Sequence, residues 1–288
     1  MTDESTVKAL RNIRLLTTAL NIPGPVAAAR LQQLGAVVTK VEPPAGDPLA
    51  QACPSWYHSL THGQEIIQLD LKSAHGSEQL HRLLDDCELL LTAHRPATLA
   101  RMGLDWPALH KRHPMLSQVA IVGVAGKDAD TPGHDLTYQA ALGLLQPPEL
   151  PRTLLADLAG AERAVSSALA LLLSRQRGGP AGYQQVALAE SAAIYAEPLA
   201  YGLTAPGGLL GGGLAGYNLY PAQEGWIALA ALEPHFRQNL ERELGLSDAT
   251  REDLQRLFRR RTAGQWEVWA AANDIPLVAV RDAPLSKK

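Results

Sequence analysis

Cysteine is scarce in this sequence of 288 residues, which holds only Cys53 and Cys87. The two lie far apart and belong to no CxxC or Cys/His pattern. Neither a disulfide framework nor a zinc site is indicated, and both side chains are expected to be reduced thiols. Dense stripes of lysine and arginine are lacking as well, and the net charge is −3. Nucleic acid and anionic membrane surfaces are therefore not expected as partners.

Long apolar runs and a secretory leader are also lacking. Runs such as Ala168–Leu173 are far shorter than the roughly 20 residues that a membrane-spanning helix needs. The segment Met1–Lys8 is polar and acidic, whereas a secretory signal is basic and then apolar. The chain ends in Ser286-Lys287-Lys288, which is not a peroxisomal address. We therefore expect a cytoplasmic protein.

What the sequence does contain is a regular alternation of strand and helix patterns in a chain of globular composition. An apolar run at Asn12–Thr18 is followed by a helical pattern that starts near Pro25 and stops at Gly35, and then by the apolar run Ala36–Val41. Strands joined through a crossover helix are parallel. Further strands are predicted at 66–69, 88–91, 117–122 and 183–188, and further helices at 77–84, 96–102 and 158–175. We predict an α/β fold with a Rossmann-like open parallel sheet.

A glycine-rich stretch divides the chain. Ala205–Gly216 holds six glycines in twelve positions, which is too flexible a composition for a packed element. We place a large domain at 1–199, a linker at 200–216 and a small α+β domain at 217–288. The small domain is predicted to hold a strand at 226–231, a helix at 234–244, one or two more helices within 251–272, and an apolar run at 275–280.

Several short motifs occur in a fixed order along the chain. They are Pro23-Gly24-Pro25, the run Leu34–Pro44 with Gly46-Asp47-Pro48, Leu69-Asp70-Leu71-Lys72, His94-Arg95-Pro96, Pro132-Gly133-His134-Asp135, Ala156–Gly160 and Glu233-Pro234-His235-Phe236. In this order they resemble the family III CoA transferases of the CaiB/BaiF type, a family that also contains the α-methylacyl-CoA racemases. The resemblance implies a CoA-binding large domain, a small domain, and a homodimer of interlocked subunits with its site between domains of different chains.

Asp157 matches the family's catalytic aspartate, which forms a covalent anhydride and thioester in transferases and acts as acid and base in racemases. From the residues alone, an aspartate before the helical run from Leu158 is also a preferred N-cap. The two roles are compatible, because the helix dipole would orient the carboxylate and keep it ionised.

His134 separates the two reactions within the resemblance, because the racemase branch has histidine where transferases usually have an aromatic residue. Inversion at an α-carbon needs one acid/base group on each face of a planar enolate, and imidazole opposite carboxylate supplies both near neutral pH. The alternative for His134 is a structural role in a glycine-containing turn. Asp135 is expected to orient its neighbour or the local turn. Glu233 matches a racemase glutamate and would fix one tautomer of the imidazole, or would only precede the helix that Pro234 opens.

The resemblance also implies residues for CoA. Lys40 and Arg95 match basic positions near the nucleotide phosphates, with an exposed salt bridge as the alternative for each. Gly133 belongs to the motif of His134, and Gly211, Gly212 and Gly213 match a mobile glycine loop over the thioester, with a plain linker as the alternative. We expect no permanently bound cofactor and no metal, with coenzyme A entering as part of the substrate.

Three functions stay open: epimerisation of a 2-methylacyl-CoA, CoA transfer through an aspartyl intermediate, and CoA binding without catalysis. The last is motivated by departures from the family. Thr61-His62-Gly63-Gln64 stands where the family has Asn-Arg-Gly-Lys, and the stretch between His134 and Asp157 is shorter than in racemases, which would change how the two side chains face each other. Family chains also continue beyond the run matching Ile275–Val280, so a shortened small domain is expected and interlocking of the subunits stays open.

Overall fold

The structure, a computed structural model, describes residues 7–282, and the chain separates into two compact units, one up to Ala196 and one from Glu197 onward. The division falls three residues before the end at 199 that the sequence suggested for the large domain. Within residues 7–282, no helix combines the length and the apolar character that crossing a membrane requires.

The first unit is built on a six-stranded sheet in which every neighbouring pair is parallel. Its strands are β1 (Arg14–Thr17), β2 (Val37–Glu42), β3 (Glu65–Gln68), β4 (Leu89–Thr92), β5 (Ser117–Val122) and β6 (Tyr183–Ala187), in the spatial order β3-β2-β1-β4-β5-β6. All residues of β4 and β5 are buried, as expected for strands covered on both faces. The predicted Rossmann-like sheet is confirmed.

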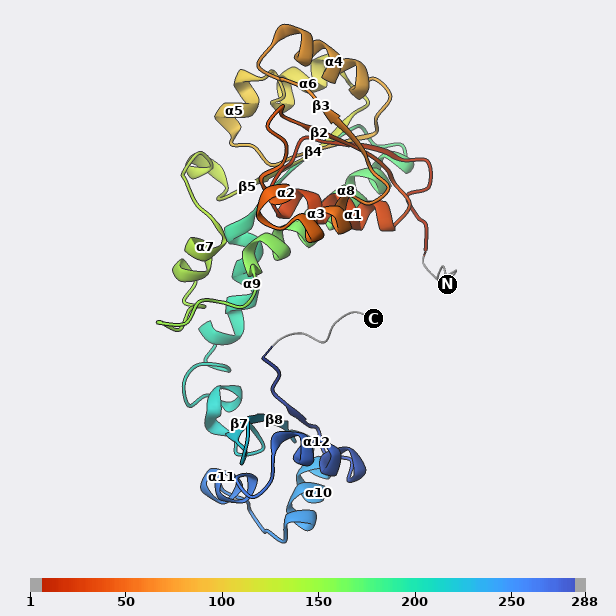
Figure 1. The fold of residues 1–288 in the computed structure, drawn as a ribbon. Helices are drawn as coiled ribbons and strands as arrows, with labels where there is room; N and C mark the ends of the chain where they lie inside the picture. Colours follow the sequence, from red (N-terminus) through yellow and green to blue (C-terminus); the bar gives the residue numbers. More distant parts are fainter. Residues whose placement is uncertain (1–6, 283–288) are drawn as a thin grey trace. The chain divides into compact units, whose positions relative to one another are not determined.

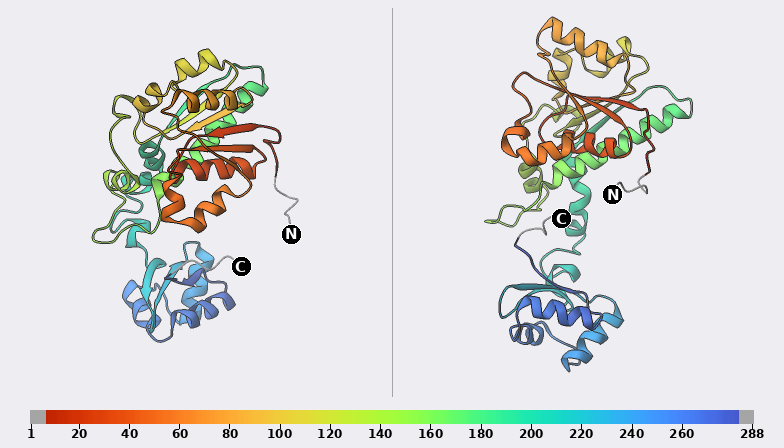
Figure 2. Two further views of the ribbon diagram at one scale, coloured as in Figure 1. Left: turned by 45° about the horizontal axis from the view of Figure 1, so that its top comes forward. Right: turned by 45° about the vertical axis from the view of Figure 1, so that its right-hand side comes forward.

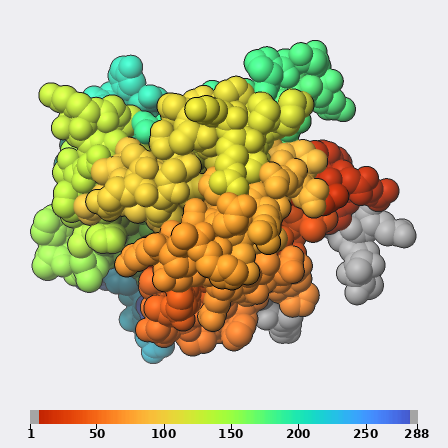
Figure 3. All heavy atoms as spheres, turned by 90° about the horizontal axis from the view of Figure 1, so that it is seen from above, coloured from red at the N-terminus to blue at the C-terminus, as the bar shows by residue number. Residues whose placement is uncertain are grey.

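Helices cover both faces of this sheet. They are α1 (Pro23–Gln33), α2 (Pro48–Ala52), α3 (Pro54–Thr61), α4 (Ala74–Leu84), α5 (Pro96–Arg101), α6 (Trp106–Arg112), α7 (Asp135–Ala141) and α8 (Leu155–Gln176), and α9 (Leu188–Ala200) runs from the first unit into the second. Figure 1 shows α1, α3 and α8 along one face and α4, α5 and α6 over the other. The two views of Figure 2 agree, and Figure 3 looks onto the orange and yellow atoms of the second layer, which form a continuous surface.

The core between α1, α8 and the sheet is made of small and aliphatic side chains. Ala27 and Ala28 of α1 and Ala161 and Ala164 of α8 are completely buried in one cluster, so the two helices approach closely. Gly160 allows the next contact, because a Cβ atom there would lie 2.2 Å from Leu188 Cδ2.

The connections that leave β1 and β4 go to opposite faces of the sheet. β1 leads to α1 on one face and its neighbour β4 leads to α5 on the other (Figure 1). Such a switch point opens a crevice at the carboxyl ends of the strands, which is where open α/β sheets bind their ligands.

The second unit is a smaller α+β structure. Its antiparallel sheet consists of β7 (Tyr217–Pro221), β8 (Trp226–Ala230) and β9 (Leu277–Ala279), and its helices are α10 (Pro234–Leu244), α11 (Arg251–Phe258) and α12 (Ala263–Ala272). Tyr220, Phe258 and Trp266 form its aromatic core, and Trp266 Nε1 donates to the carbonyl of Phe258 at 2.7 Å.

The glycine-rich stretch differs from the prediction, because it is folded. Leu209–Gly213 forms a short π-helical turn, and Gly213 N donates to Gly208 O at 2.9 Å. The glycines permit contact between backbones, since a Cβ atom at Gly211 would lie 1.9 Å from Ala205 O. The composition that suggested a flexible linker therefore serves close packing of the chain on itself.

Candidate active site

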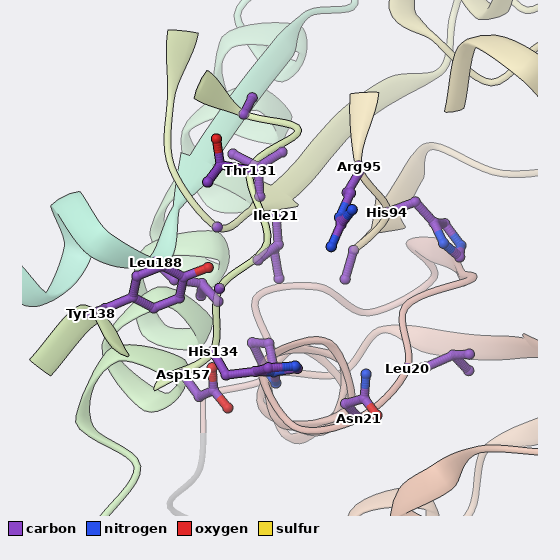
Figure 4. A pocket seen from close by; sticks show the side chains of 16 residues that line it. Leu20, Asn21, His94, Arg95, Ile121, Thr131, His134, Tyr138, Asp157 and Leu188 are labelled. Atoms are coloured by element: carbon purple, nitrogen blue, oxygen red, sulfur yellow. The ribbon is translucent and has the colours of Figure 1, made fainter. Parts of the chain in front are cut away.

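A cavity of about 260 Å³ lies at the switch point, in the first unit (Figure 4). It is lined by the loops after β1, β4 and β5, by the turn before α7, and by the first turns of α7, α8 and α9. Its lining residues are Leu20, Asn21, Pro23, Ala93, His94, Arg95, Ile121, Val122, Gly123, Ala129, Thr131, Gly133, His134, Tyr138, Asp157 and Leu188. Four residues that the sequence predicted for the site, Arg95, Gly133, His134 and Asp157, meet here.

Asp157 does not cap the helix that carries it, so that interpretation was wrong. Helix α8 begins at Leu155, three residues earlier than predicted, and Asp157 lies inside its first turn. The cap comes from Asp135 at the start of α7, whose Oδ1 accepts from Ala156 N at 2.7 Å and from Asp157 N at 3.1 Å. Gln139 Nε2 donates to the other oxygen, and Asp135 is buried. The expectation that Asp135 orients its surroundings thus has a structural basis, although its target is the turn that bears Asp157.

The charge on Asp157 is destabilised by its position. Burial raises the pKa of its carboxyl group, the nearby Asp135 carboxylate raises it further, and His134 opposes them, with the result that the pKa rises from 3.8 to about 6. The expected help from the helix dipole is outweighed, because a second carboxylate already occupies the free amides of α8. A carboxyl group with this pKa can both accept and donate a proton near neutral pH.

His134 stands at the N-cap position of α7. Its backbone N donates to Thr137 Oγ1 at 3.1 Å, which holds the turn, and its side chain is exposed. In the view of Figure 4 the imidazole extends from the Asp157 side of the cavity toward Asn21. The imidazole and the carboxylate therefore line the same space.

Tyr138 is a lining residue that the sequence analysis missed. It lies one helical turn after His134, and a Cβ atom at Gly133 or Gly123 would come within 2.4 or 2.1 Å of its hydroxyl oxygen. Both positions must therefore remain glycine for the ring to lie where it does. The spacing of four residues from His134 on a helix was the signal that could have found it.

Arg95 and His94 follow β4 on the opposite wall. The Arg95 side chain points into the cavity in Figure 4, and its positive charge favours the ionised form of the Tyr138 hydroxyl, whose pKa burial raises. Burial lowers the pKa of His94, and its buried Nε2 has no partner among the described residues.

A second, apolar cavity of about 190 Å³ adjoins the first, with which it shares Leu20 and His94. Its other walls come from the residues after β2, β3 and β4, including Leu69, Leu71 and Met102, with Asp70 and Lys72 among the lining residues.

Lys40, predicted to contact CoA, lies elsewhere. It is completely buried in β2, with Nζ 2.5 Å from Glu42 Oε1 and 2.8 Å from Asp47 Oδ2, and it lines neither cavity. A lysine that is buried and paired in this way cannot reach a ligand phosphate, so the prediction was wrong. The apolar strand around Lys40 and the carboxylates that follow it were the signals for burial.

The remaining predicted residues belong to the second unit. Glu233 is exposed at the N-cap position of α10 without a side-chain cap hydrogen bond, and Gly211, Gly212 and Gly213 lie in the folded glycine turn. Their roles near the thioester stay predictions.

Comparison with known proteins places these features in a family. The family described as CoA-transferase family III has a sequence model that matches residues 10–284. The protein named "Probable fatty acyl-CoA transferase Rv3272" of Mycobacterium tuberculosis is 30% identical over 206 residues, which are 65% of this chain and 52% of that protein. Succinyl-CoA–D-citramalate CoA-transferase of Chloroflexus aurantiacus is 27% identical over 256 residues, which are 80% of this chain and 63% of that enzyme.

The fold is also that of a solved relative. The crystal structure of Rv3272 from Mycobacterium tuberculosis superposes with a TM-score of 0.83 at 26% identity, covering 97% of this chain and 88% of that one. The chain spans less than two thirds of the length of the two curated relatives.

Proposed function

The chain belongs to CoA-transferase family III, and we propose that it acts on acyl-CoA thioesters by epimerising a 2-methylacyl-CoA at its α-carbon. The observation that carries the proposal is the shared cavity of His134 and Asp157, in which the pKa of Asp157 is raised to about 6. Such a carboxyl group exchanges protons readily near neutral pH, where a carboxyl group with its ordinary pKa would remain ionised.

The reaction needs one proton removed and one returned. The carboxylate of Asp157 takes the proton from C2, and the electron pair of the C–H bond moves into an enolate whose negative charge rests on the thioester oxygen. The protonated imidazole of His134 then delivers a proton to the other face of C2, which inverts the centre. The reverse reaction exchanges the two roles, and the chemistry requires no resident metal or redox cofactor.

Coenzyme A would extend from this cavity along the carboxyl edge of the sheet. Arg95 supplies a positive charge that a CoA phosphate could pair with. The adjoining cavity has an apolar wall suited to a nucleotide base, and Lys72 lines it. In this arrangement Arg95 contacts a CoA phosphate, as expected from the sequence, and Lys40 makes no contact with CoA.

A homodimer belongs to the same proposal. Exposed apolar side chains on α9 and just beyond it, Ile194, Tyr195 and Tyr201, are 62%, 52% and 87% exposed and would be covered by a second copy of the chain.

Deuterium incorporation tests the reaction directly. The protein is incubated with a 2-methylacyl-CoA in heavy water, and deuterium at C2 is measured by mass spectrometry. We expect exchange that falls at least about 100-fold in Asp157→Asn and in His134→Gln, the usual size of an acid/base contribution. Asp128→Asn, at an exposed carboxylate outside the cavity, is the matched control and should exchange normally. Exchange at the rate of a protein-free sample would refute the proposal.

CoA transfer is the second candidate, because the curated relatives described above carry transferase names. In that reaction the Asp157 carboxylate attacks the thioester carbonyl, the C–S bond breaks, CoA leaves as thiolate, and a mixed anhydride remains on the protein. Hydroxylamine would trap this anhydride and inactivate the protein only when acyl-CoA is present. Intact-protein mass spectra that show no adduct during turnover would exclude this route.

A further inference from the structure

A buried network of charges lies beneath the loop between β1 and α1. Lys40 is completely buried, and its ammonium group contacts Glu42 and Asp47, both of which are themselves buried. The Tyr57 hydroxyl donates to Glu42 Oε1 at 2.8 Å. Because an isolated buried charge is costly, the ammonium group fixes where the two carboxylates can lie.

Asp47 connects this network to the cavity wall. One of its oxygens, Oδ2, contacts Lys40, and the other accepts two backbone hydrogen bonds, from Leu49 N at 2.9 Å and from Asn21 N at 3.1 Å. The first of these bonds caps α2, and the second crosses to the loop after β1. The second bond plays no part in capping α2, because Asn21 lies 26 residues away in sequence and belongs to another loop.

Asn21 has a left-handed backbone conformation. Its φ is +67°, in a region that among residues other than glycine is adopted chiefly by asparagine and aspartate. The hydrogen bond from Asn21 N to Asp47 is thus made from a tight turn of the loop. Asn21 and the adjacent Leu20 line the cavity of His134 and Asp157. The charge network therefore ends at a residue that lines the candidate active site.

We propose that Asp47, held by Lys40, is a positioning residue that keeps the Leu20–Asn21 wall in place for the acyl-CoA ligand. This assigns to Lys40 an indirect role in place of the phosphate contact that its sequence position suggested. The ligand part of the inference rests on the proposed function, whereas the part that concerns the loop does not.

Asp47→Asn separates the two sides of the connection. An asparagine has one acceptor oxygen, and keeping it on the loop amides would set its NH₂ group against the Lys40 ammonium, two donors facing each other. The oxygen is therefore expected to accept from Lys40, which leaves Asn21 N without an acceptor. Glu42→Gln is the matched control, because it removes one negative charge from the same buried network and has no contact with Asn21. Asp47→Ser is a second variant, because serine still caps α2 but is too short to serve Lys40 and the loop together.

Hydrogen–deuterium exchange of the full chain measures how firmly the loop between β1 and α1 is held. In Asp47→Asn we expect the peptide covering 18–26 to exchange roughly 10- to 100-fold faster, as for the loss of one hydrogen bond to a charged group, with peptides of the second unit unchanged. Glu42→Gln should leave that peptide within about twofold of the original, which is less than the loss of one hydrogen bond. Loop exchange in Asp47→Asn and Asp47→Ser no faster than in Glu42→Gln overturns the inference.

Titration with acetyl-CoA measures whether the position of the loop affects ligand affinity. Its Kd should rise about 5-fold or more in Asp47→Asn, the size of one lost polar contact, and stay unchanged in Glu42→Gln. If Lys40 contacted a CoA phosphate instead, Glu42→Gln would release its ammonium group from Glu42, and the affinity for CoA would increase more than the affinity for 3′-dephospho-CoA. That result would also overturn the inference. Should the original protein bind no acetyl-CoA, the proposed function fails, and the exchange comparison still decides whether Asp47 positions the loop.

Discussion

Replacing Asp157 by asparagine is expected to stabilise the first unit at neutral pH. The folded protein holds this carboxyl group at a pKa of about 6, and the ordinary value is 3.8. Between these pH values the folded protein binds more protons than the unfolded chain, so its stability falls as the pH rises through 6. Above that pH the ionised carboxylate costs stability in full. Asparagine keeps the shape of the side chain and carries no charge.

The size of the gain follows from the same numbers. The difference between about 6 and 3.8 corresponds to about 3 kcal/mol. Because Asp157 lies at a cavity and is partly solvated, we discount this figure to roughly 1–2 kcal/mol. For a unit of this length, such a gain raises the melting temperature by roughly 2–8 °C. At pH 4.5 about a third of the gain should remain, since the group is by then almost fully protonated in the folded protein and still mostly ionised in the unfolded chain.

Thermal and urea denaturation at pH 7.5 and 4.5 measure the effect, with Asp128→Asn as the control at an exposed position, where a change within about 0.5 kcal/mol is expected. A variant that is less stable than the original at pH 7.5, or a gain that does not shrink at pH 4.5, would refute the assignment of a raised pKa. The deuterium-exchange activity should be lost in the same variant, so stability and activity would move in opposite directions.

Two further changes test other parts of the first unit. His81 and His113 stack with 2.9 Å between His81 Nδ1 and His113 Nε2, and burial lowers the pKa of both. The stability that this neutral pair contributes is therefore fully present above about pH 6.5 and is lost as the pH falls. His113→Gln should reduce the difference between urea midpoints at pH 7.5 and 5.5, and an undiminished difference would contradict this. Gly133→Ala would place a Cβ atom 2.4 Å from the Tyr138 hydroxyl oxygen and should cost about 1–3 kcal/mol and weaken acyl-CoA binding. Gly264→Ala, where no atom lies within 4 Å of the added Cβ, is the control, and equal losses at both sites would show that Tyr138 does not set the effect.

The parallel sheet was predictable because its strands are continuous apolar runs. The expected strand 117–122 coincides with β5, and the bounds of the other five strands of the first unit were predicted to within about two residues. Helices α2, α3, α6 and α7 were not predicted, because five to eight residues show too little periodicity. The bounds of α8 were missed for a related reason. Its cap is supplied by Asp135, which is distant in sequence, so no local signal marked its start.

The candidate site was predictable where it rests on motifs and unpredictable where it rests on burial. Motif residues His134 and Asp157 line one cavity, as the resemblance implied. The raised pKa of Asp157 depends on how deeply the group is buried and on Asp135, which composition does not report. Lys40 was misassigned because a basic residue in a phosphate-binding family suggests a ligand contact, whereas its surroundings in β2 make it an internal counter-ion.

The two hydrogen bonds that the Asp135 carboxylate accepts from the start of α8 bear on how the length of this chain can change. They join the residue next to His134 directly to the turn that carries Asp157, across 21 and 22 positions of sequence. The intervening segment 142–154 is therefore not what sets the separation of the two reactive side chains. A change in the length of that segment would leave these two hydrogen bonds in place, so the shorter stretch expected from the sequence is compatible with both groups lining one cavity.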